Sequence, residues 1–285
     1  LNGAHLTMLN FPEQLLKGIQ LIRIASGLDH CYYGIEKNKQ DAIDLLNSLH
    51  PENYGIEIVP EEVKYPQGGE KMQVKAVTGR EVKPGGIPSG VGCNVVSTRT
   101  AYAIYQACYE GKPVIERIVT VAGSALKAPV NALTRVGTPF EYLAEQCGGF
   151  VKTPRKIVLG GPMMGICATS FEAPTIKGTA GVLFFTEEED RHVEHPTCIR
   201  CGKCITVCPM NLEPVFMYMY YNKGDFEMMQ KYHITDCFEC GSCAFNCPAR
   251  MPLTHAFKTA KLMFQAKAAK EKAAAEAKAA KEAQK

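Results

Sequence analysis

Eight cysteines between Cys198 and Cys247 form two runs with the same spacing. The runs are Cys198-x-x-Cys201-x-x-Cys204-x-x-x-Cys208-Pro209 and Cys237-x-x-Cys240-x-x-Cys243-x-x-x-Cys247-Pro248. Three thiolates at this spacing can bind three corners of one iron–sulfur cube, and in two-cluster ferredoxins the fourth cysteine binds the other cluster. We therefore predict one [4Fe–4S] cluster on Cys198, Cys201, Cys204 and Cys247, and a second on Cys237, Cys240, Cys243 and Cys208.

Zinc is the main alternative, because closely spaced Cys-x-x-Cys pairs also form tetrahedral zinc sites. A zinc site uses two such pairs, however, and gives no role to the third cysteine of a run or to the proline after the fourth. A disulfide framework is typical of small secreted domains, which this chain of 285 residues is not. Thiolate-bound clusters need reducing surroundings, so we expect a compartment like the cytosol.

Length and charge restrict the possible functions further. The chain of 285 residues is long enough for two or three domains. It has no run of about 18 apolar residues, so we expect no membrane-spanning helix. Leu1 is not an initiator methionine, and we expect an N-terminal portion to precede it.

The formal net charge of +3 lies in the tail 266–285, where six lysines outnumber three glutamates. The rest of the chain is neutral, which argues against a nucleic-acid-binding surface. The tail is rich in alanine, lysine and glutamate, which favour helix. It predicts a solvated helix or a frayed extension, and docking to an acidic partner or an anionic membrane surface is the alternative.

The N-terminal part predicts an α/β unit over 11–59. An apolar helical face begins after Pro12, a strand is expected at Cys31–Ile35, Asn38 is expected to cap a helix ending near Leu49, and Ile56–Val59 is a second strand. Strand, helix and strand imply a parallel crossover, whose ligands bind at the carboxyl ends of the strands. A further helix is expected over 94–109.

The segment from Tyr65 to Pro88 is rich in glycine. Its backbone amides could approach a phosphate or a flavin edge, with Lys71, Arg80 or Lys83 supplying positive charge. Ordinary turns at proline and glycine are the other interpretation, since the chain contains no Gly-x-Gly-x-x-Gly fingerprint.

Short β-rich pieces follow Pro113, with strands at Val114–Val121, Ile157–Leu159 and Val182–Phe185, a turn at Thr134–Thr138 and a short helix at Pro139–Cys147. This pattern predicts a β-grasp module. The loop Gly160-Gly161-Pro162-Met163-Met164-Gly165 is either a tight turn that packs methionines on a neighbouring domain or a contact to a cluster.

After an acidic linker at 187–190, the cysteine runs are separated by residues that predict two helices broken at Gly224. Helices rather than hairpins between the runs indicate a helical ferredoxin, and Leu253–Phe264 continues as an amphipathic helix. The remaining cysteines have apolar neighbours and are expected to be buried small hydrophobes; they are Cys31, Cys93, Cys108, Cys147 and Cys167.

Four segments together resemble the RnfC family, whose members belong to ion-translocating Rnf electron transport complexes. They are Tyr65-Pro66-Gln67-Gly68-Gly69-Glu70-Lys71, Ala76-Val77-Thr78-Gly79-Arg80-Glu81-Val82, the glycine–methionine loop at 160–165, and Cys198-Ile199-Arg200-Cys201-Gly202-Lys203-Cys204. The resemblance covers nearly the whole chain apart from the tail.

The resemblance implies four parts. Residues 1–112 are expected to form an α/β flavin- and NADH-binding domain like the complex I flavoprotein subunit, and 113–186 a β-grasp SLBB module. Residues 187–264 are expected to form a helical two-cluster ferredoxin domain, and 265–285 a helical or disordered tail.

The resemblance also implies FMN, NADH as substrate, and positions that contact them. Asn2 matches an asparagine under the flavin, Gly69 and Glu70 match a Gly-Glu pair at the isoalloxazine and nicotinamide, and Lys83 matches a lysine near the dinucleotide. Ser97 and Thr100 fall where the family has an Asn and a Thr around FMN. The family's glycine-rich phosphate loop and its Glu-Cys-Glu-Pro stretch are absent, so either segments are omitted from this sequence or the flavin has been lost; we favour omission.

The implied role is an NADH:ferredoxin oxidoreductase subunit, an enzyme component of a translocase. It would pass single electrons through both clusters toward other membrane and iron–sulfur subunits and, indirectly, ferredoxin. The implied location is peripheral, on the cytoplasmic face of the cell membrane. Two alternatives remain: a cobalamin reductase of the same architecture, and a flavin-free iron–sulfur relay and docking subunit.

Overall fold

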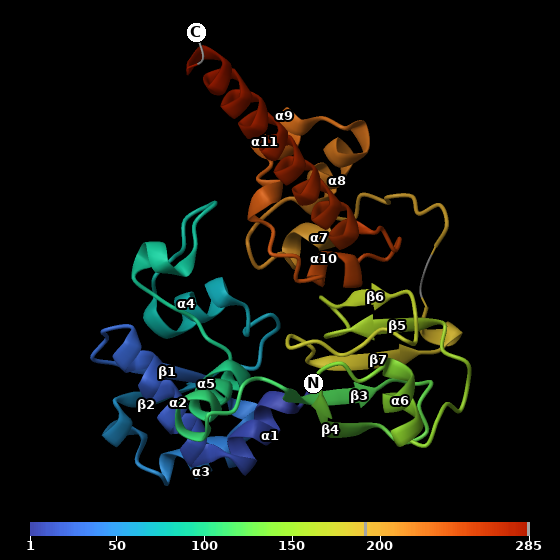
Figure 1. Cartoon of the computed structure of the whole chain (residues 1–285). Coiled ribbons are helices and arrows are strands. Elements are labelled where there is room, and N and C mark those ends of the chain that lie inside the picture. Colours follow the sequence, from blue (N-terminus) through green and yellow to red (C-terminus); the bar gives the residue numbers. More distant parts are fainter. Residues whose placement is uncertain (191–192, 284–285) are drawn as a thin grey trace. The chain divides into compact units, whose positions relative to one another are not determined.

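The computed structural model of the protein describes residues 1–190 and 193–283. The chain divides into two compact units, Leu1–Asp190 and Arg191–Lys285. The first unit contains an α/β part and a five-stranded sheet, and the second is helical (Figure 1). Residues 191–192 of the expected ferredoxin domain and 284–285 of the expected tail lie outside the described residues.

Two parallel strands organise the α/β part of the first unit. Strand β1 (Cys31–Glu36) pairs with β2 (Ile56–Glu61), and helix α3 (Gln40–Asn47) connects them. Parallel strands require a crossover of this kind. The expected strand–helix–strand unit is confirmed. Its apolar core contains Leu15, Leu16, Ile35, Ile43, Leu46 and Ile56.

Four further helices complete this part: α1 (Gly3–Asn10), α2 (Pro12–Ala25), α4 (Glu70–Thr78) and α5 (Thr98–Glu110). Single 3-10 turns lie at η1 (Lys37–Lys39), η2 (Pro51–Tyr54) and η3 (Pro88–Val91). Pro12 stands at the start of α2, where its missing N–H has no helical partner to lose.

Helix α4 was not expected from the sequence, and two of the local predictions for this part are wrong. Glu70–Thr78 is helical because a run of helix-favouring residues is flanked rather than interrupted by glycine. Asn38 caps no helix, since its amide oxygen accepts a hydrogen bond from Lys39 Nζ at 3.0 Å and α3 begins two residues later. The helix expected from residue 94 begins at Thr98, after the Ser97 cap.

The five-stranded sheet has the strand order β4-β3-β7-β5-β6. A hairpin comes first, then helix α6, then a second hairpin, and the last strand β7 enters the middle parallel to β3 (Figure 1). This is the strand order of a β-grasp fold, as expected. The elements are β3 (Glu116–Ala122), β4 (Val130–Arg135), α6 (Phe140–Gln146), β5 (Lys156–Leu159), β6 (Ile166–Ala168), β7 (Gly181–Phe185) and the 3-10 turn η4 (Glu187–Glu189).

Phe140 and Phe184 are fully buried in the core between the sheet and α6. The expected turn at Thr134–Thr138 starts too early, because Thr134 and Arg135 still pair with β3. The 160–165 loop is a tight turn between β5 and β6, in which the Gly165 N–H donates to Gly161 O at 2.7 Å.

Hydrogen bonds join the α/β part to the sheet within the first unit. Arg99 Nη1 donates to Thr179 O at 3.1 Å, and Arg117 Nη1 donates to Arg99 O at 3.0 Å. The Asn2 N–H donates to Thr120 Oγ1 at 3.2 Å. These bonds hold the first turn of α5 and the start of α1 against the sheet.

The second unit contains six helical segments within the described residues: α7 (Lys203–Thr206), α8 (Pro214–Lys223), α9 (Phe226–Lys231), η5 (Ile234–Asp236), α10 (Ser242–Phe245) and α11 (Leu253–Ala283). The two helices expected between the cysteine runs are α8 and α9, and Gly224 ends α8 with a φ of 66°. Cys243 and Cys247 belong to the core of this unit, beside Met217, Met229 and Phe257. None of the described helices is long and apolar enough to cross a membrane.

The contact between α2 and α5 yields the first prediction. A Cβ atom added to Gly18 would lie 2.1 Å from the backbone oxygen of Ala101, which has no room to move. Gly18→Ala is therefore expected to destabilise the first unit by about 1 to 3 kcal/mol, because overpacking outweighs the gain in helix propensity. Thermal unfolding followed by circular dichroism measures the change.

Gly178→Ala is the matched control, because nothing lies within 4 Å of the added atom. An equal melting temperature for the two variants would contradict the close packing of α2 on α5.

Candidate metal centre

The two cysteine runs fold into the same backbone shape, each position lying 39 residues from its counterpart. Short helices α7 and α10 follow Gly202 and Gly241, whose φ angles are 74° and 85°. Outside glycine, positive φ recurs at matched positions: Arg200 (56°) with Glu239 (61°), and Asn211 (54°) with Arg250 (57°). Such residues are uncommon in this conformation, so their recurrence shows that both runs form one specific loop.

Backbone N–H groups point at the sulfur atoms in both runs. The Sγ of the first cysteine, Cys198 or Cys237, accepts from the N–H two residues later, at 3.4 Å in each run. The fourth cysteines accept from the N–H four residues later, Cys208 Sγ at 3.3 Å and Cys247 Sγ at 3.5 Å. These bonds favour ionised sulfur, the form that binds metal.

Each run's fourth cysteine lies with the other run. Burial raises the pKa of the Cys204 thiol, and the nearby sulfurs of Cys247 and Cys198 raise it further. Burial likewise raises the pKa of Cys237 to about 11, with Cys208 and Cys240 adding to the increase. The structure thus brings Cys247 to Cys198 and Cys204, and brings Cys208 to the second run.

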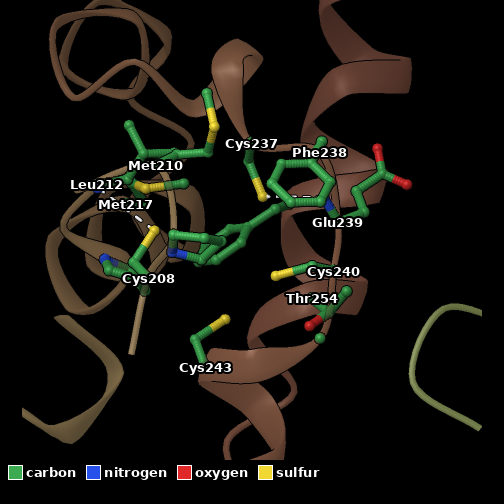
Figure 2. Close-up of a pocket in the computed structure, with 14 residues that line it drawn as sticks. Cys208, Met210, Leu212, Met217, Cys237, Phe238, Glu239, Cys240, Cys243 and Thr254 are labelled. Carbon is green, nitrogen blue, oxygen red and sulfur yellow. Dashed lines mark hydrogen bonds between the residues drawn. The ribbon is translucent and has the colours of Figure 1, made fainter. Parts of the chain in front are cut away.

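A pocket is lined by Cys208, Cys237, Cys240 and Cys243, and Figure 2 shows their sulfur atoms facing a common space. Met210, Met217 and Phe257 supply apolar walls. The four sulfurs of the second set therefore share one partly apolar pocket.

The donors in this pocket fit an iron–sulfur cluster. Burial, with the sulfurs of Cys237 and Cys240, raises the pKa of Cys243 to about 12, so these thiols ionise together only when a cation compensates. No disulfide joins any of the thirteen cysteines, all of which lie in the described part of the chain. Among the described residues, no three His, Cys, Asp or Glu side chains are placed to hold a metal ion as a group. This does not argue against a cluster, because the thiolates that bind an iron–sulfur cube each bind a different corner. They therefore lie farther apart than the ligands of a single ion.

The two sets of cysteines differ in exposure. Cys198 and Cys201 are exposed, whereas Cys240 and Cys243 are only 8% exposed. Of the five other cysteines expected to be buried, only Cys147 is buried, and Cys31 and Cys93 are half-buried. Cys108 and Cys167 are exposed, because the former lies on the outer face of α5 and the latter in the edge strand β6.

The residues expected to contact FMN or NADH lie in four places. Asn2 precedes α1, and Gly69 and Glu70 begin α4. Lys83 is exposed in the loop between α4 and η3, and Ser97 and Thr100 begin α5. Within the described residues, no hydrogen bond joins one of these places to another.

Ser97 and Thr100 contact each other directly. Ser97 Oγ accepts from the Thr100 N–H at 3.2 Å and lies 2.9 Å from Thr100 Oγ1. This is an N-cap, which satisfies one of the free N–H groups at the start of α5. The contact between Ser97 and Thr100 is thus that of an ordinary helix N-cap, which forms whether or not a flavin is bound.

Sequence reasoning missed Lys261, which contacts the second cysteine loop. Its Nζ donates to Cys237 O at 2.6 Å and to Glu239 Oε1 at 2.9 Å. Sequence reasoning also missed the N–H donors to sulfur, although the 39-residue repeat could have indicated them as matched positions.

Comparison with known proteins agrees with these parts. Residues 1–106 match the model of the Nuo51 FMN-binding domain, 118–166 that of the SLBB domain, and 197–251 that of the 4Fe-4S dicluster domain. The C subunit of the proton-translocating ferredoxin:NAD(+) oxidoreductase complex of Clostridium ljungdahlii is 37% identical over 83% of this chain. The C subunit of the Na(+)-translocating complex of Acetobacterium woodii is 36% identical over 92% of it.

The chain belongs to the RnfC family. It spans about half the length of the curated relatives, 52% of the Clostridium protein and 59% of the Acetobacterium protein. The expected family and fold class are confirmed.

A solved structure supports the fold of this RnfC-family chain. An NAD+-reducing [NiFe]-hydrogenase, crystallised in the H2-reduced state, matches with a TM-score of 0.54 and 16% identity, over 91% of this chain and 45% of the hydrogenase chain. At that identity the likeness concerns the fold alone.

The crossed arrangement of the cysteines yields the second prediction. In an iron-loaded Cys208→Ala variant, Cys237, Cys240 and Cys243 lack their fourth sulfur, so they should become reactive to a thiol alkylator. Cys198, Cys201 and Cys204 should stay protected. Alkylated positions are mapped by mass spectrometry, and Cys247→Ala should give the reverse pattern.

Cys108→Ala is the control, because this exposed cysteine lies in the other unit. Loss of protection within the mutated cysteine's own run would show that each run binds its cluster alone.

Proposed function

We propose that this RnfC-family chain is the electron-input component of an Rnf-type complex. It oxidises NADH at FMN and passes single electrons through two [4Fe–4S] clusters toward ferredoxin, and other subunits couple the reaction to ion transport. The observation that carries the proposal is the crossed grouping of seven of the eight cysteines, in a chain whose first 106 residues match an FMN-binding domain model.

We assign the first cluster to Cys198, Cys201, Cys204 and Cys247, and the second to Cys237, Cys240, Cys243 and Cys208. Each cluster then takes three sulfurs from one loop and one from the other. The chain's part is to hold the sulfurs at fixed corners, donate backbone N–H groups to four of them, and surround the second set with apolar side chains. Such N–H bonds and burial adjust cluster potentials.

FMN, when bound, supplies the exchange between two-electron hydride transfer and one-electron transfer. We assign the flavin and nicotinamide contacts to Asn2, Gly69, Glu70, Lys83, Ser97 and Thr100. Gly69 and Glu70 stand at the start of α4, and Ser97 and Thr100 at the start of α5. Helix starts carry free N–H groups and a partial positive charge, which suits an anionic cofactor.

We also propose domain boundaries, partners and a location for the chain. Residues 1–112 form the flavin and NADH domain, 113–186 the SLBB module, 187–264 the two-cluster domain and 265–285 a tail. Partners are the membrane and iron–sulfur subunits of the complex, and indirectly ferredoxin. The location is peripheral, at the cytoplasmic face of the cell membrane.

One observation favours a second candidate, a flavin-free relay. The cysteines converge, whereas the six flavin positions occupy separate segments without a hydrogen bond between the segments in the described part of the chain. A relay of this kind would accept electrons at its clusters and pass them on without oxidising NADH.

Cofactor analysis distinguishes the two candidates. The full-length protein, reconstituted anaerobically, is expected to bind about eight irons, four in each of two clusters, together with one FMN released by acid and measured by fluorescence. NADH should then bleach the visible absorption of the clusters. Clusters without flavin, unaffected by NADH but bleached by dithionite, would establish the relay instead.

Glu70 provides a residue-level test of the NADH site. Glu70→Gln is expected to slow NADH-driven bleaching at least tenfold, the cost of about 1.4 kcal/mol of lost substrate interaction. Bleaching by dithionite should not change, because it bypasses the nicotinamide. Glu13→Gln, on the first turn of α2, is the control, and equal NADH rates in both variants would remove Glu70 from the site.

A further inference from the structure

The two halves of the cysteine repeat have the same backbone conformation but different charged residues. Arg200 and Lys203 occupy the first loop, and their counterparts 39 residues later are Glu239 and Ser242. Both cations of the first loop are exposed to solvent. The second loop carries a carboxylate instead, although its cysteines are the more buried set.

Lys261 brings a cation to the second loop from helix α11. Its Nζ donates to the carbonyl oxygen of Cys237 at 2.6 Å and to Glu239 Oε1 at 2.9 Å. The side chains of Lys261 and Glu239 are each 25% exposed, so water screens this charge less than it screens a surface lysine. The ammonium group thus contacts the backbone carbonyl of a cysteine assigned to the second cluster.

The matching position in the first half of the repeat carries no cation. The counterpart of Lys261 is Asn222 on α8, which is exposed and whose side chain makes no hydrogen bond within the described part of the chain. The cation is therefore an addition to one half of the repeat and not a consequence of its shared backbone.

Charge near a cluster acts on its reduction potential. Reduction adds one negative charge to the cluster, which burial disfavours and a nearby cation favours. A buried cluster without a cation would be much harder to reduce than an exposed one beside two cations.

We infer that Lys261, held by Glu239, raises the reduction potential of the cluster bound by Cys208, Cys237, Cys240 and Cys243, and so keeps electron transfer between the two clusters feasible. This inference rests on the proposed function, because it requires both clusters. Lys261 does not bind iron; it acts through the carbonyl and the sulfur of Cys237.

The test is a potentiometric titration of the full chain, followed by electron paramagnetic resonance, which resolves one reduction wave for each cluster. Lys261→Met removes the charge and keeps an apolar stem, so one wave should move to more negative potential and the other should stay. Lys261→Arg keeps the charge and should restore the wave. Glu239→Gln removes the opposing charge and should move the same wave to more positive potential.

Asn222→Lys is the repeat-matched control, and it should leave that wave unmoved. Opposite shifts from the two members of one ion pair support the inference, because a merely structural role would disturb the cluster in the same way in both variants. Shifts in the same direction, or two unmoved waves in Lys261→Met, overturn it. If Lys261→Met binds no clusters, the direction of the Glu239→Gln shift decides.

Iron and sulfide are measured before each titration. An unmutated chain without two clusters overturns the proposed function itself. Two clusters whose waves ignore both substitutions overturn only the role of Lys261.

Discussion

In the second unit, several cysteine sulfurs lie close together in a partly apolar interior. If they ionise, their negative charges need a compensating cation. Thiols in this position resist ionisation, as the raised pKa values of Cys237 and Cys243 show. Cys243 and Cys247 also belong to the apolar core of the unit. Under the proposed function, cation binding at these sulfurs and folding of the unit are expected to be linked, because the same cysteines contribute to the core.

The first unit follows a different principle. Its α/β part and its β-grasp sheet each bury their own apolar core, built on Leu15 and Leu16 in one and on Phe140 and Phe184 in the other. Hydrogen bonds of Arg99 and Arg117 to backbone oxygens join the two parts. The packing of this unit therefore comes from apolar side chains and from these hydrogen bonds.

The repeat in the second unit separates geometry from electrostatics. Matched left-handed residues, matched helices and matched N–H to sulfur bonds impose one geometry on both sites. The charged residues around that geometry differ, with Arg200 on one side and the Glu239–Lys261 pair on the other. A chain built in this way can change the properties of one cluster without altering the ligands of either.

Local patterns in the sequence predicted the two matching cysteine loops, the strand–helix–strand unit and the break between two helices at Gly224. Each of these features depends on residues only a few positions apart. Tertiary structure alone decided that Lys261 reaches a loop 24 residues away, and that Cys108 and Cys167 are exposed. It also separated the six flavin positions into different segments. Contacts between distant residues are set by how whole helices and strands pack, and periodicity within one segment carries no information about that packing.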